Sequence, residues 1–488
     1  MREVWTTDRV RAAEATVLAR TPPGSLMRHA AFAVSVHAAR MLADGPGRVS
    51  GSKVTLLVGA GDNGGDALWA GAFLRKRGVG VTAVLLAPDR THAEGLAALR
   101  RAGGRVVTGD AADQHIAAAD LVIDGIVGLS ARGCLRPAAA ELVSAITSPV
   151  LAVDLPSGVE PNTGAVAGPA VTAEVTVTCG AYKPLHVLAP AATHCGDVRL
   201  VDIGLRPELG EPDMVLLGAE DVGHAWPIPG PADDKYTQGV TGIAAGSSTY
   251  PGAAVLATGG AVLATSGMVR YAGHAADLVR AQWPEVIATG SLADAGRVQS
   301  WVVGPGIGTG SAGHETLRAV LSSGVPVCAD ADAITLLAAA PELLDARDPG
   351  TPLVLTPHAG EFARFAGEIG EDRVAAVRSA AKRANAVVLL KGHSTVIAAP
   401  DGRVLVNYSG SSWPATPGSG DVLAGIIGSL LASGMDPCFA AGCAAYAHDL
   451  AADLAAHGAP APATAICAAI PDAIRALRHP GAASPAGR

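Results

Sequence analysis

The sequence predicts an α/β protein with two domains, each built on a mainly parallel sheet. Short runs of β-branched residues alternate with Ala- and Leu-rich segments at helical spacing in both halves of the chain. At about 150 residues per domain, the length of 488 residues predicts two or three domains. Hydrophobic residues make up 49 % of the chain and charged residues 16 %, which excludes a disordered protein and provides apolar surface for more than one core.

The first half contains β-branched runs that predict strands, separated by segments with helical spacing. The expected strands are 54–58, 81–86, 121–124, 150–154, 171–178 and 198–203. The expected helices are 64–77, 91–102 and 137–146. The polar stretch 206–213, which holds two prolines, interrupts the pattern and predicts a linker. We therefore expect one domain at 1–213 and a second at 214–488.

The second half shows the same alternation but no sequence repeat of the first half, so we expect two different folds. Its expected strands are 240–245, 302–303, 325–329, 353–355, 387–390 and 395–398. It closes on three expected helices, 420–432, 439–457 and 463–477.

Composition and charge narrow the class of protein. The net charge is −8 with no run of like charges, whereas a nucleic-acid binder carries a basic stripe, so no nucleic-acid partner is expected. The seven cysteines form no CxxC pair, which favours reduced thiols in the cytoplasm over a zinc site or disulfides. The first residues are too charged for a signal peptide. Residues 236–268 carry no charge, but their seven glycines and Pro251 predict a strand, a turn and a buried helix, so no membrane contact is expected.

A glycine-rich loop follows the first expected strand and opens a helix. It satisfies the GxGxxG pattern through Gly59, Gly61 and Gly64, so its backbone N–H groups can approach a phosphate. The pattern alone also describes a tight strand–helix turn without a ligand. The acidic residue that dinucleotide-binding dehydrogenases place about 20 residues later has no clear counterpart, because Asp89 lies beyond the next strand.

Oxygen-bearing side chains follow two further strands of the first half. Asp124 opens a glycine-rich loop, and Ser157 lies three residues after Asp154 at the end of the next strand. The carboxyl ends of parallel strands share one edge of a sheet, where ligands bind. Asn63, Asp124 and Ser157 should therefore gather oxygen atoms suited to a hard cation.

These residues resemble the NAD(P)H-hydrate epimerases, whose segments N-N-G-G-D-G, D-x-I-F-G and D-I-P-S-G match 62–67, 124–128 and 154–158. The chain departs from the family at Asp62, where the family has Asn, and at Ala67, where it has Gly. The resemblance implies a K⁺ ion on Asn63, Asp124 and Ser157. The residues it implies for the hydrated nicotinamide nucleotide are Asp62, Asn63, Gly64, Gly65, Asp66, Gly128, Leu129, Ser130, Ala131, Arg132, Gly133, Cys134 and Asp154.

Epimerisation of the hydrated ring carbon needs proton transfer on both faces of the ring, or a transient opening of its C–O bond. A carboxylate within hydrogen-bond reach is the natural base, and Asp154 is our candidate. Lys183 belongs to a segment that matches a Thr…Lys-Pro pattern of the same family. We leave open whether it polarises the site, contacts a phosphate or is a solvated surface lysine.

The strongest motif of the second half is Gly-Ser-Gly-Asp at 418–421, followed by an apolar helix. Consecutive backbone N–H groups at a helix start form an anion hole for a phosphoryl group. Asp421 can accept the proton of the attacking hydroxyl, although an acidic residue there is also a good helix cap. The turn 391–395 between two strands offers backbone groups and a Thr hydroxyl to nucleotide phosphates.

These two motifs resemble the ribokinase-like superfamily. Five further motifs narrow the resemblance to NAD(P)H-hydrate dehydratases, and they lie at 235–239, 246–253, 303–308, 330–333 and 355–361. Trp413-Pro414 and Pro417 depart from the family pattern. The residues implied for the hydrate are Ala253, Gly306, Gly308, His358 and Asp421. Those implied for the adenine nucleotide are Lys391, Gly392, His393, Ser394, Thr395 and Gly420.

Together the resemblances imply an N-terminal Rossmann-like three-layer αβα domain followed by a ribokinase-like α/β domain. They imply a cytoplasmic, homo-oligomeric enzyme that epimerises the R and S hydrates of NADH and NADPH. It would dehydrate the S form at the expense of ADP, with Mg²⁺, and release AMP and phosphate. ATP as donor, and the preference between the two hydrates, stay open. The alternatives are a ribokinase-like small-molecule kinase fused to a non-catalytic nucleotide-binding module and, third, a dehydrogenase.

Overall fold

The computed structural model describes residues 1–108, 112–130, 133–265, 267–408 and 411–479. The chain divides into two compact units. The N-terminal unit is Glu3–Asp213, and the C-terminal unit is Met214–Arg488 together with Met1–Arg2. The division falls at the end of the polar stretch 206–213, which contains only one short helical turn.

The N-terminal unit is built on a seven-stranded sheet in the order β4-β3-β2-β5-β6-β7-β8, with parallel pairing throughout. Its strands are β2 (Lys53–Val58), β3 (Gly80–Leu85), β4 (Arg105–Val107), β5 (Leu121–Gly125), β6 (Val150–Val153), β7 (Val175–Cys179) and β8 (Asp197–Val201). Its helices are α1 (Thr7–Leu18), α2 (Ser25–Asp44), α3 (Asp62–Arg75), α4 (Ala93–Arg101), α5 (Ala112–Ala117) and α6 (Pro137–Ser144).

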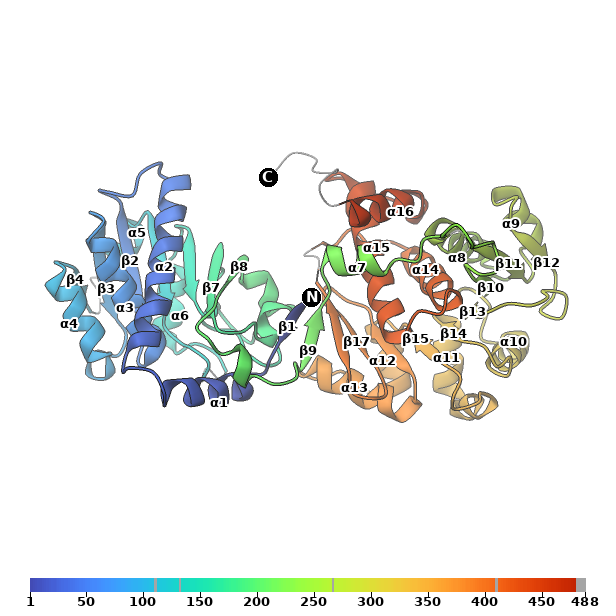
Figure 1. Cartoon of the computed structure of the whole chain (residues 1–488), viewed down its shortest axis with the longest axis horizontal. Coiled ribbons are helices and arrows are strands. Elements are labelled where there is room, and N and C mark those ends of the chain that lie inside the picture. Colours follow the sequence, from blue (N-terminus) through green and yellow to red (C-terminus); the bar gives the residue numbers. More distant parts are fainter. Residues whose placement is uncertain (109–111, 131–132, 266, 409–410, 480–488) are drawn as a thin grey trace. The chain divides into compact units, whose positions relative to one another are not determined.

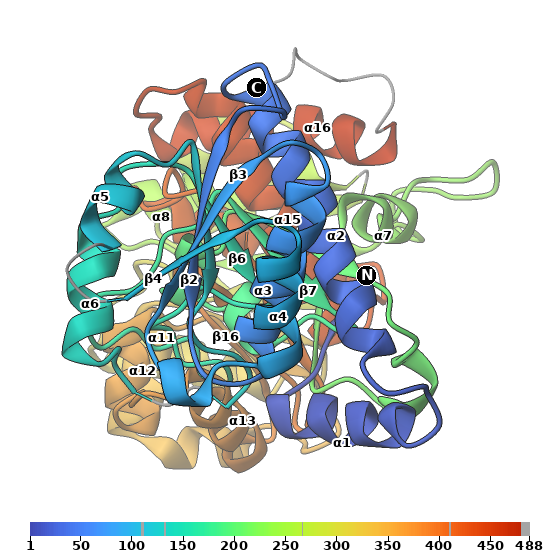
Figure 2. The ribbon, with the colours of Figure 1, turned by 90° about the vertical axis from the view of Figure 1, so that its left-hand side faces the viewer.

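Helices cover both faces of this sheet. Figure 2 shows α2, α3 and α4 on one side of the strands and α5 and α6 on the other. Two separate hydrophobic clusters fill these interfaces, one including Leu56, Leu68 and Leu99 and the other including Leu57 and Ile116. Adjacent strand residues Leu56 and Leu57 thus point to opposite cores, as the pleat of a doubly covered strand requires. The unit is a three-layer αβα domain, as expected.

The C-terminal unit is built on a sheet with the strand order β9-β18-β17-β16-β15-β14-β13-β10-β11-β12, and β1, which begins in this unit at Arg2, is the edge strand beside β9. β16, β17 and β18 pair antiparallel, whereas β10 to β16 pair in parallel. The strands are β1 (Arg2–Val4), β9 (Met214–Leu216), β10 (Val240–Ala244), β11 (Met268–Ala272), β12 (Ile287–Thr289), β13 (Ser300–Val303), β14 (Val327–Ala329), β15 (Leu353–Leu355), β16 (Val387–Leu390), β17 (Thr395–Ala398) and β18 (Val404–Asn407).

Helices lie on both sides of this sheet as well. In Figure 1, α8, α14, α15 and α16 lie on one side of the strands, and α10 to α13 lie on the other. The helices are α7 (Ala219–Ala225), α8 (Pro251–Ala264), α9 (Ala276–Gln282), α10 (Ser311–Leu321), α11 (Asp332–Ala339), α12 (Ala359–Ala366), α13 (Arg373–Ala384), α14 (Ser419–Ala432), α15 (Pro437–Ala456) and α16 (Ala463–Arg478).

The central helix pair, α8 and α14, packs through glycines. A Cβ atom on Gly425 of α14 would lie 2.1 Å from the carbonyl oxygen of Ala257 on α8. A Cβ atom on Gly260 of α8 would lie 2.3 Å from the carbonyl oxygen of Val422. Neither helix can accept a larger residue there, so the two backbones lie in direct contact within the first two turns of α14.

The α/β class and most expected elements are confirmed. The uncharged stretch 236–268 forms β10 and α8 as predicted, and none of the described helices combines the length and apolarity that crossing a bilayer requires. The expected strand 171–178 is wrong at its start, because β7 begins only at Val175. Before it, the Val171 N–H donates to the Ser157 carbonyl and the Ala173 N–H to the His194 carbonyl. These two bonds turn the segment away from the ladder.

Substitution of Gly425 by Ala should destabilise the C-terminal unit by about 1–3 kcal/mol, because the added methyl group meets backbone atoms that cannot rotate away. Gly252→Ala on α8 is the control, since its Cβ would meet no atom within 4 Å. Urea unfolding measured by fluorescence and circular dichroism compares the two variants. Equal unfolding free energies for both variants would contradict the packing described here.

Candidate functional sites

In the N-terminal unit, the loops after β2, β5, β6 and β7 meet at the carboxyl edge of the sheet, because these strands are neighbours and parallel. The loop after β2 lies directly against the loop after β5. A Cβ atom on Gly59 would lie 1.8 Å from the Ile126 carbonyl oxygen, so only glycine fits. Gly61 has a φ of 99° and turns the chain into α3.

The three predicted cation ligands come together at this edge. The buried Asp124 carboxylate accepts hydrogen bonds from the Ser157 backbone N–H and hydroxyl, both at 2.7 Å. The Asn63 side-chain amide donates to the carbonyl oxygens of Val127 and Val153, both at 2.7 Å. Burial raises the pKa of Asp124 to about 6, although hydrogen bonds from Ser157 oppose the shift. A buried carboxylate beside a serine hydroxyl offers oxygen atoms of the kind that a hard cation prefers.

Asp154 is held by a buried ion pair. It follows β6 with a φ of 66°, a strained conformation for a residue other than glycine. Lys183, which is fully buried, donates to its Oδ1 atom, and the Thr178 hydroxyl donates to the same oxygen at 3.0 Å. Burial raises the pKa of Asp154, but the Lys183 ammonium more than offsets this, so the pKa lies below its usual value. Asp154 is therefore ionised.

His186 and Thr178 support this pair. Thr178 belongs to the Thr…Lys-Pro segment of the sequence analysis, whereas sequence reasoning did not single out His186. The Lys183 ammonium also donates to the Thr178 hydroxyl at 2.7 Å and to the Cys179 carbonyl at 3.2 Å. His186 Nε2 lies 3.0 Å from the Asp154 carbonyl oxygen. Burial, followed by repulsion from Lys183, lowers the pKa of His186 to about 3, so the ring is neutral. Lys183 thus has its three donors engaged and is not a solvated surface lysine.

Two carboxyl groups with raised pKa values lie in the field of this pair. Burial raises the pKa of Glu14 on α1 to about 7, with Lys183 lowering it and Asp154 raising it. Burial and repulsion from Asp154 raise the pKa of Asp66 on α3 well above its usual value. Within the described part of the chain, the buried Oδ1 atom of Asp66 has no hydrogen-bond partner. Glu14 was not predicted, because the motifs of the first half begin after α1.

The rest of the predicted epimerase residues lie on the same edge or beside it. Gly128 faces Asn63, since a Cβ on Gly128 would lie 2.6 Å from the Asn63 Oδ1 atom. The Leu129 carbonyl accepts from Arg11 of α1 at 2.8 Å. Gly64 and Gly65 are buried in the first turn of α3, and Asp62, Ser130, Gly133 and Cys134 are exposed. Ala131 and Arg132 lie outside the described residues.

The C-terminal unit gathers its motifs in the same way, because β10, β13, β14, β15 and β16 are adjacent and parallel. Gly306 follows β13 with a φ of 64°, and a Cβ there would lie 3.0 Å from the Ala253 Cβ atom. The Gly308 N–H donates to the Asp332 carboxylate at 2.8 Å. His358 caps α12, its Nδ1 accepting from the Gly360 N–H at 3.0 Å, and its side chain is largely exposed.

At the first turn of α14, Asp421 lies beside an ion pair between Lys391 and Asp330. The Lys391 Nζ atom donates to Asp330 Oδ1 at 2.6 Å, and a Cβ on Gly420 would lie 3.0 Å from that Nζ. Burial, then repulsion from Asp330, raises the pKa of Asp421 to about 7, although Lys391 lowers it and Asp332 adds to the rise. Asp421 can therefore gain and lose a proton near neutral pH.

The predicted nucleotide turn follows β16 and is anchored by neighbouring residues. The Arg373 guanidinium of α13 donates to the Lys391 carbonyl at 2.7 Å. The His393 ring meets the Tyr408 ring edge-on at 5.5 Å between centroids. Inside the unit, the Ser419 hydroxyl lies 2.9 Å from His448 Nε2, whose pKa burial lowers to about 4. Sequence reasoning missed His448, which lies on α15 within a plain Ala-rich helix pattern.

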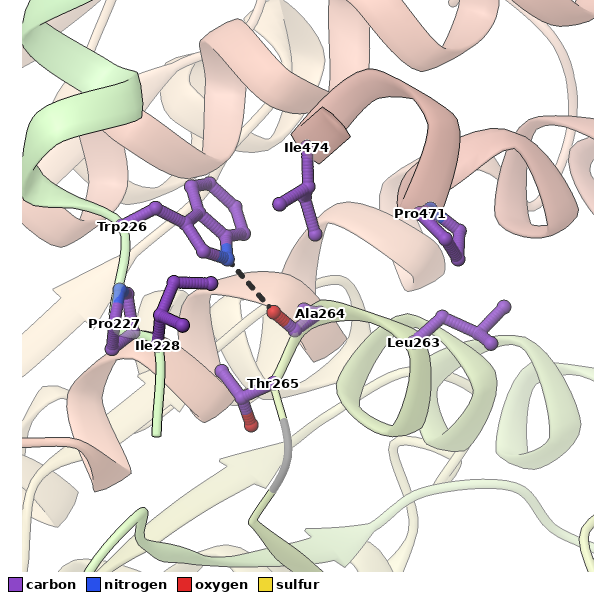
Figure 3. Close-up of a pocket in the computed structure, with 8 residues that line it drawn as sticks. All are labelled: Trp226, Pro227, Ile228, Leu263, Ala264, Thr265, Pro471 and Ile474. Atoms are coloured by element: carbon purple, nitrogen blue, oxygen red, sulfur yellow. Dashed lines mark hydrogen bonds between the residues drawn. The ribbon is translucent and has the colours of Figure 1, made fainter. Parts of the chain in front are cut away.

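A separate cavity of about 180 Å³ contains none of the predicted site residues. Figure 3 shows that the Trp226 indole crosses it toward α8 and donates to the Ala264 carbonyl, at 2.9 Å. Its other lining residues are Pro227, Ile228, Leu263, Thr265, Pro471 and Ile474. None of these lining residues has an ionisable side chain.

Lys183→Met should destabilise the N-terminal unit by about 3–5 kcal/mol, because it leaves the buried Asp154 carboxylate without its counter-charge. The double variant Lys183→Met/Asp154→Asn should recover most of this loss, since the remaining side chain is neutral. Urea unfolding of wild type, single and double variants measures the difference. A double variant no more stable than Lys183→Met would contradict the assignment of the loss to the unpaired charge.

Each of the two units matches a known protein family. Residues 23–185 match the family model of the YjeF-related protein N-terminus, and residues 241–472 match that of NAD(P)H-hydrate dehydratase. The bifunctional NAD(P)H-hydrate repair enzyme Nnr of Mycobacterium tuberculosis is 55 % identical over 89 % of this chain and 90 % of its own length. That of Mycobacterium leprae is 54 % identical over 93 % of this chain and 94 % of its own.

A solved structure agrees with the fold of the C-terminal unit. The ribokinase-like superfamily protein EF1790 from Enterococcus faecalis superposes with a TM-score of 0.50 and 24 % identity, covering 54 % of this chain and 96 % of that one. This likeness concerns the fold, and it agrees with the expected ribokinase-like architecture.

Proposed function

This chain belongs to the family of bifunctional NAD(P)H-hydrate repair enzymes, and we propose that each unit carries one of two activities. The N-terminal unit interconverts the R and S hydrates of NADH and NADPH. The C-terminal unit dehydrates the S form at the expense of ADP, releasing AMP and phosphate. The observation that carries this proposal is the position of Asp421, in the first turn of α14 beside the Lys391 ammonium.

In the N-terminal unit, Asp154 is the base. The ring carbon inverts if its C–O bond opens, with the ring nitrogen supplying electrons, and water adds to the opposite face. The departing oxygen must gain a proton and the added water must lose one. Asp154 is ionised and accepts a proton, whereas the raised pKa values of Glu14 and Asp66 make these carboxyl groups better able to hold a proton and donate it. Lys183 fixes the Asp154 carboxylate.

In the C-terminal unit, Asp421 accepts the proton of the hydrate hydroxyl while that oxygen attacks the terminal phosphorus of ADP. The bond from this phosphorus to AMP breaks, and the backbone N–H groups of Gly418 and Gly420 with the Lys391 ammonium bind the charged oxygens. Phosphate then leaves the ring carbon, aided by the ring nitrogen, and the neighbouring carbon loses a proton. The double bond is restored.

Two ions fit these sites. Asn63, Asp124 and Ser157 would hold K⁺, which supplies positive charge beside the buried Asp124 carboxylate. Mg²⁺ would enter on the ADP phosphates, because it binds through phosphates and retains several waters. ADP and the two hydrates are then the expected small-molecule partners, in a cytoplasmic homo-oligomer.

An assay with mixed R and S hydrates of NADH, ADP and the full chain tests both activities. The wild type should convert all of the hydrate to NADH. Asp154→Ala should convert the S half rapidly and the remainder only at the spontaneous rate, with epimerisation slowed on the order of 10²–10⁴-fold. Asp421→Asn lacks the base, so it should not form NADH at a rate comparable to that of the wild type. Absorbance of NADH and chiral chromatography of the residual hydrate provide the measurements.

Other outcomes separate the alternatives. A stable phosphorylated product in place of phosphate would indicate a small-molecule kinase. Half conversion by wild type would indicate a dehydratase whose N-terminal unit only binds. Unchanged conversion by Asp154→Ala would overturn the assignment of that residue.

The dehydration should depend on pH through Asp421. Because the reaction needs its ionised form and its pKa is about 7, kcat/KM should rise about tenfold per pH unit below pH 7 and level off above it. The raised pKa also means that the folded unit binds this proton more tightly than the unfolded chain. Stability should therefore fall as the pH rises from about 4 to about 7. Asp421→Asn should melt at a higher temperature than wild type at pH 8, and an identical melting profile would contradict the shift.

A further inference from the structure

The segment between β14 and α11 presents two carboxylates from one strained turn. Ala331 has φ 52° and ψ −115°, values that favour glycine, and the Ala333 N–H closes the turn on the Asp330 carbonyl at 3.1 Å. On one side of Ala331, Asp330 binds Lys391, and on the other, Asp332 accepts from the Gly308 N–H. This turn therefore connects the nucleotide turn with the glycine loop after β13.

The two members of the Lys391–Asp330 pair differ in exposure. The Asp330 side chain is 2 % exposed, whereas the Lys391 side chain is 23 % exposed. The carboxylate thus lies behind the ammonium, which reaches the site surface beside the backbone of Gly420. Asp330 Oδ2 also lies near Gly420, 3.5 Å from a Cβ placed there, but because its side chain is only 2 % exposed we expect Asp330 to act on a nucleotide through Lys391.

We propose that Asp330 is a positioning residue of the dehydratase: its carboxylate holds the Lys391 ammonium beside Gly420, where the ammonium meets the transferring phosphoryl group and stays apart from Asp421. This inference rests on the proposed function of the C-terminal unit. Neither family model nor sequence motif assigned a task to Asp330.

The charges around Lys391 explain why a fixed partner matters. Burial lowers the pKa of Lys391, but the ion pair with Asp330 more than offsets this, with Glu361 and Asp421 adding to the rise. Lys391 therefore lies in the field of three carboxylates. Without Asp330, the ammonium would be attracted to Asp421, the carboxylate that has to remain free to accept a proton. Pairing with Asp330 keeps the charge near the phosphate and the base available.

Asp330→Asn in the full chain tests the proposal, after wild-type dehydration has been measured. We expect kcat/KM for ADP to fall on the order of 10²-fold, and MgADP to bind more weakly in calorimetry. Asp330 and Asp332 raise the pKa of Asp421, whereas Lys391 lowers it. Removing the Asp330 charge should therefore move the acid limb of the pH profile to lower pH. Asp401→Asn, which breaks the exposed pair with Arg403, is the control and should leave these values unchanged.

A double-mutant cycle with Lys391→Met decides how Asp330 acts. If it acts through Lys391, Asp330→Asn adds no further loss of MgADP affinity or rate in the Lys391→Met background. If Asp330→Asn alone folds poorly, the double variant can still be compared with Lys391→Met, because the double variant removes both charges of the pair. An equal loss in both backgrounds, or an unshifted acid limb, would overturn the proposal. An inactive wild type would instead refute the proposed function.

Discussion

Both sites depend on keeping a carboxylate and an ammonium together where little water reaches them. The chain has 36 basic residues but only six lysines, and two of these form the ion pairs Lys183–Asp154, which is buried, and Lys391–Asp330, whose carboxylate is buried. A compact ammonium has three donors that point in different directions, whereas guanidinium is a planar fork. Lys183 uses its donors on three oxygens, those of Asp154, Thr178 and Cys179. Such a small cluster has no room for an arginine.

The same components produce opposite proton affinities in the two units. Lys183 bonds directly to Asp154, so the pKa of this carboxyl lies below its usual value despite burial. Lys391 is already engaged with Asp330 and acts on Asp421 only through space, so burial dominates and the pKa of Asp421 is about 7. Which carboxylate receives the lysine therefore decides which one is ionised at neutral pH and which one titrates near it. The first suits a fixed base in an isomerisation, and the second suits a base that must release its proton after each phosphoryl transfer.

The sequence was sufficient to predict which loop residues lie together after the strand ends, because parallel strands place their carboxyl ends on one edge of the sheet. This rule brought Asn63, Asp124 and Ser157 together correctly. It could not identify Glu14, which comes from a helix outside the strand–loop pattern and acts through tertiary placement. Asp330 was visible as part of a motif, but its partner lies 61 residues away. Only the pairing of β14, β15 and β16 brings these two residues together.

The helix that carries Asp421 is located by backbone contact. Gly425 of α14 meets the Ala257 carbonyl of α8, and this contact lies one turn beyond Asp421. A contact between main-chain atoms has no rotamers to rearrange, so it fixes the position and tilt of the first turn more tightly than interdigitated side chains would. The N–H groups of that turn point along the helix axis, so a fixed axis also fixes the direction in which they would meet an anion. The scarcity of aromatic residues, 3 % of the chain, is then consistent with cores in which helices approach through Gly and Ala. Close backbone packing is what allows a helix start, a buried lysine and two aspartates to occupy one small volume.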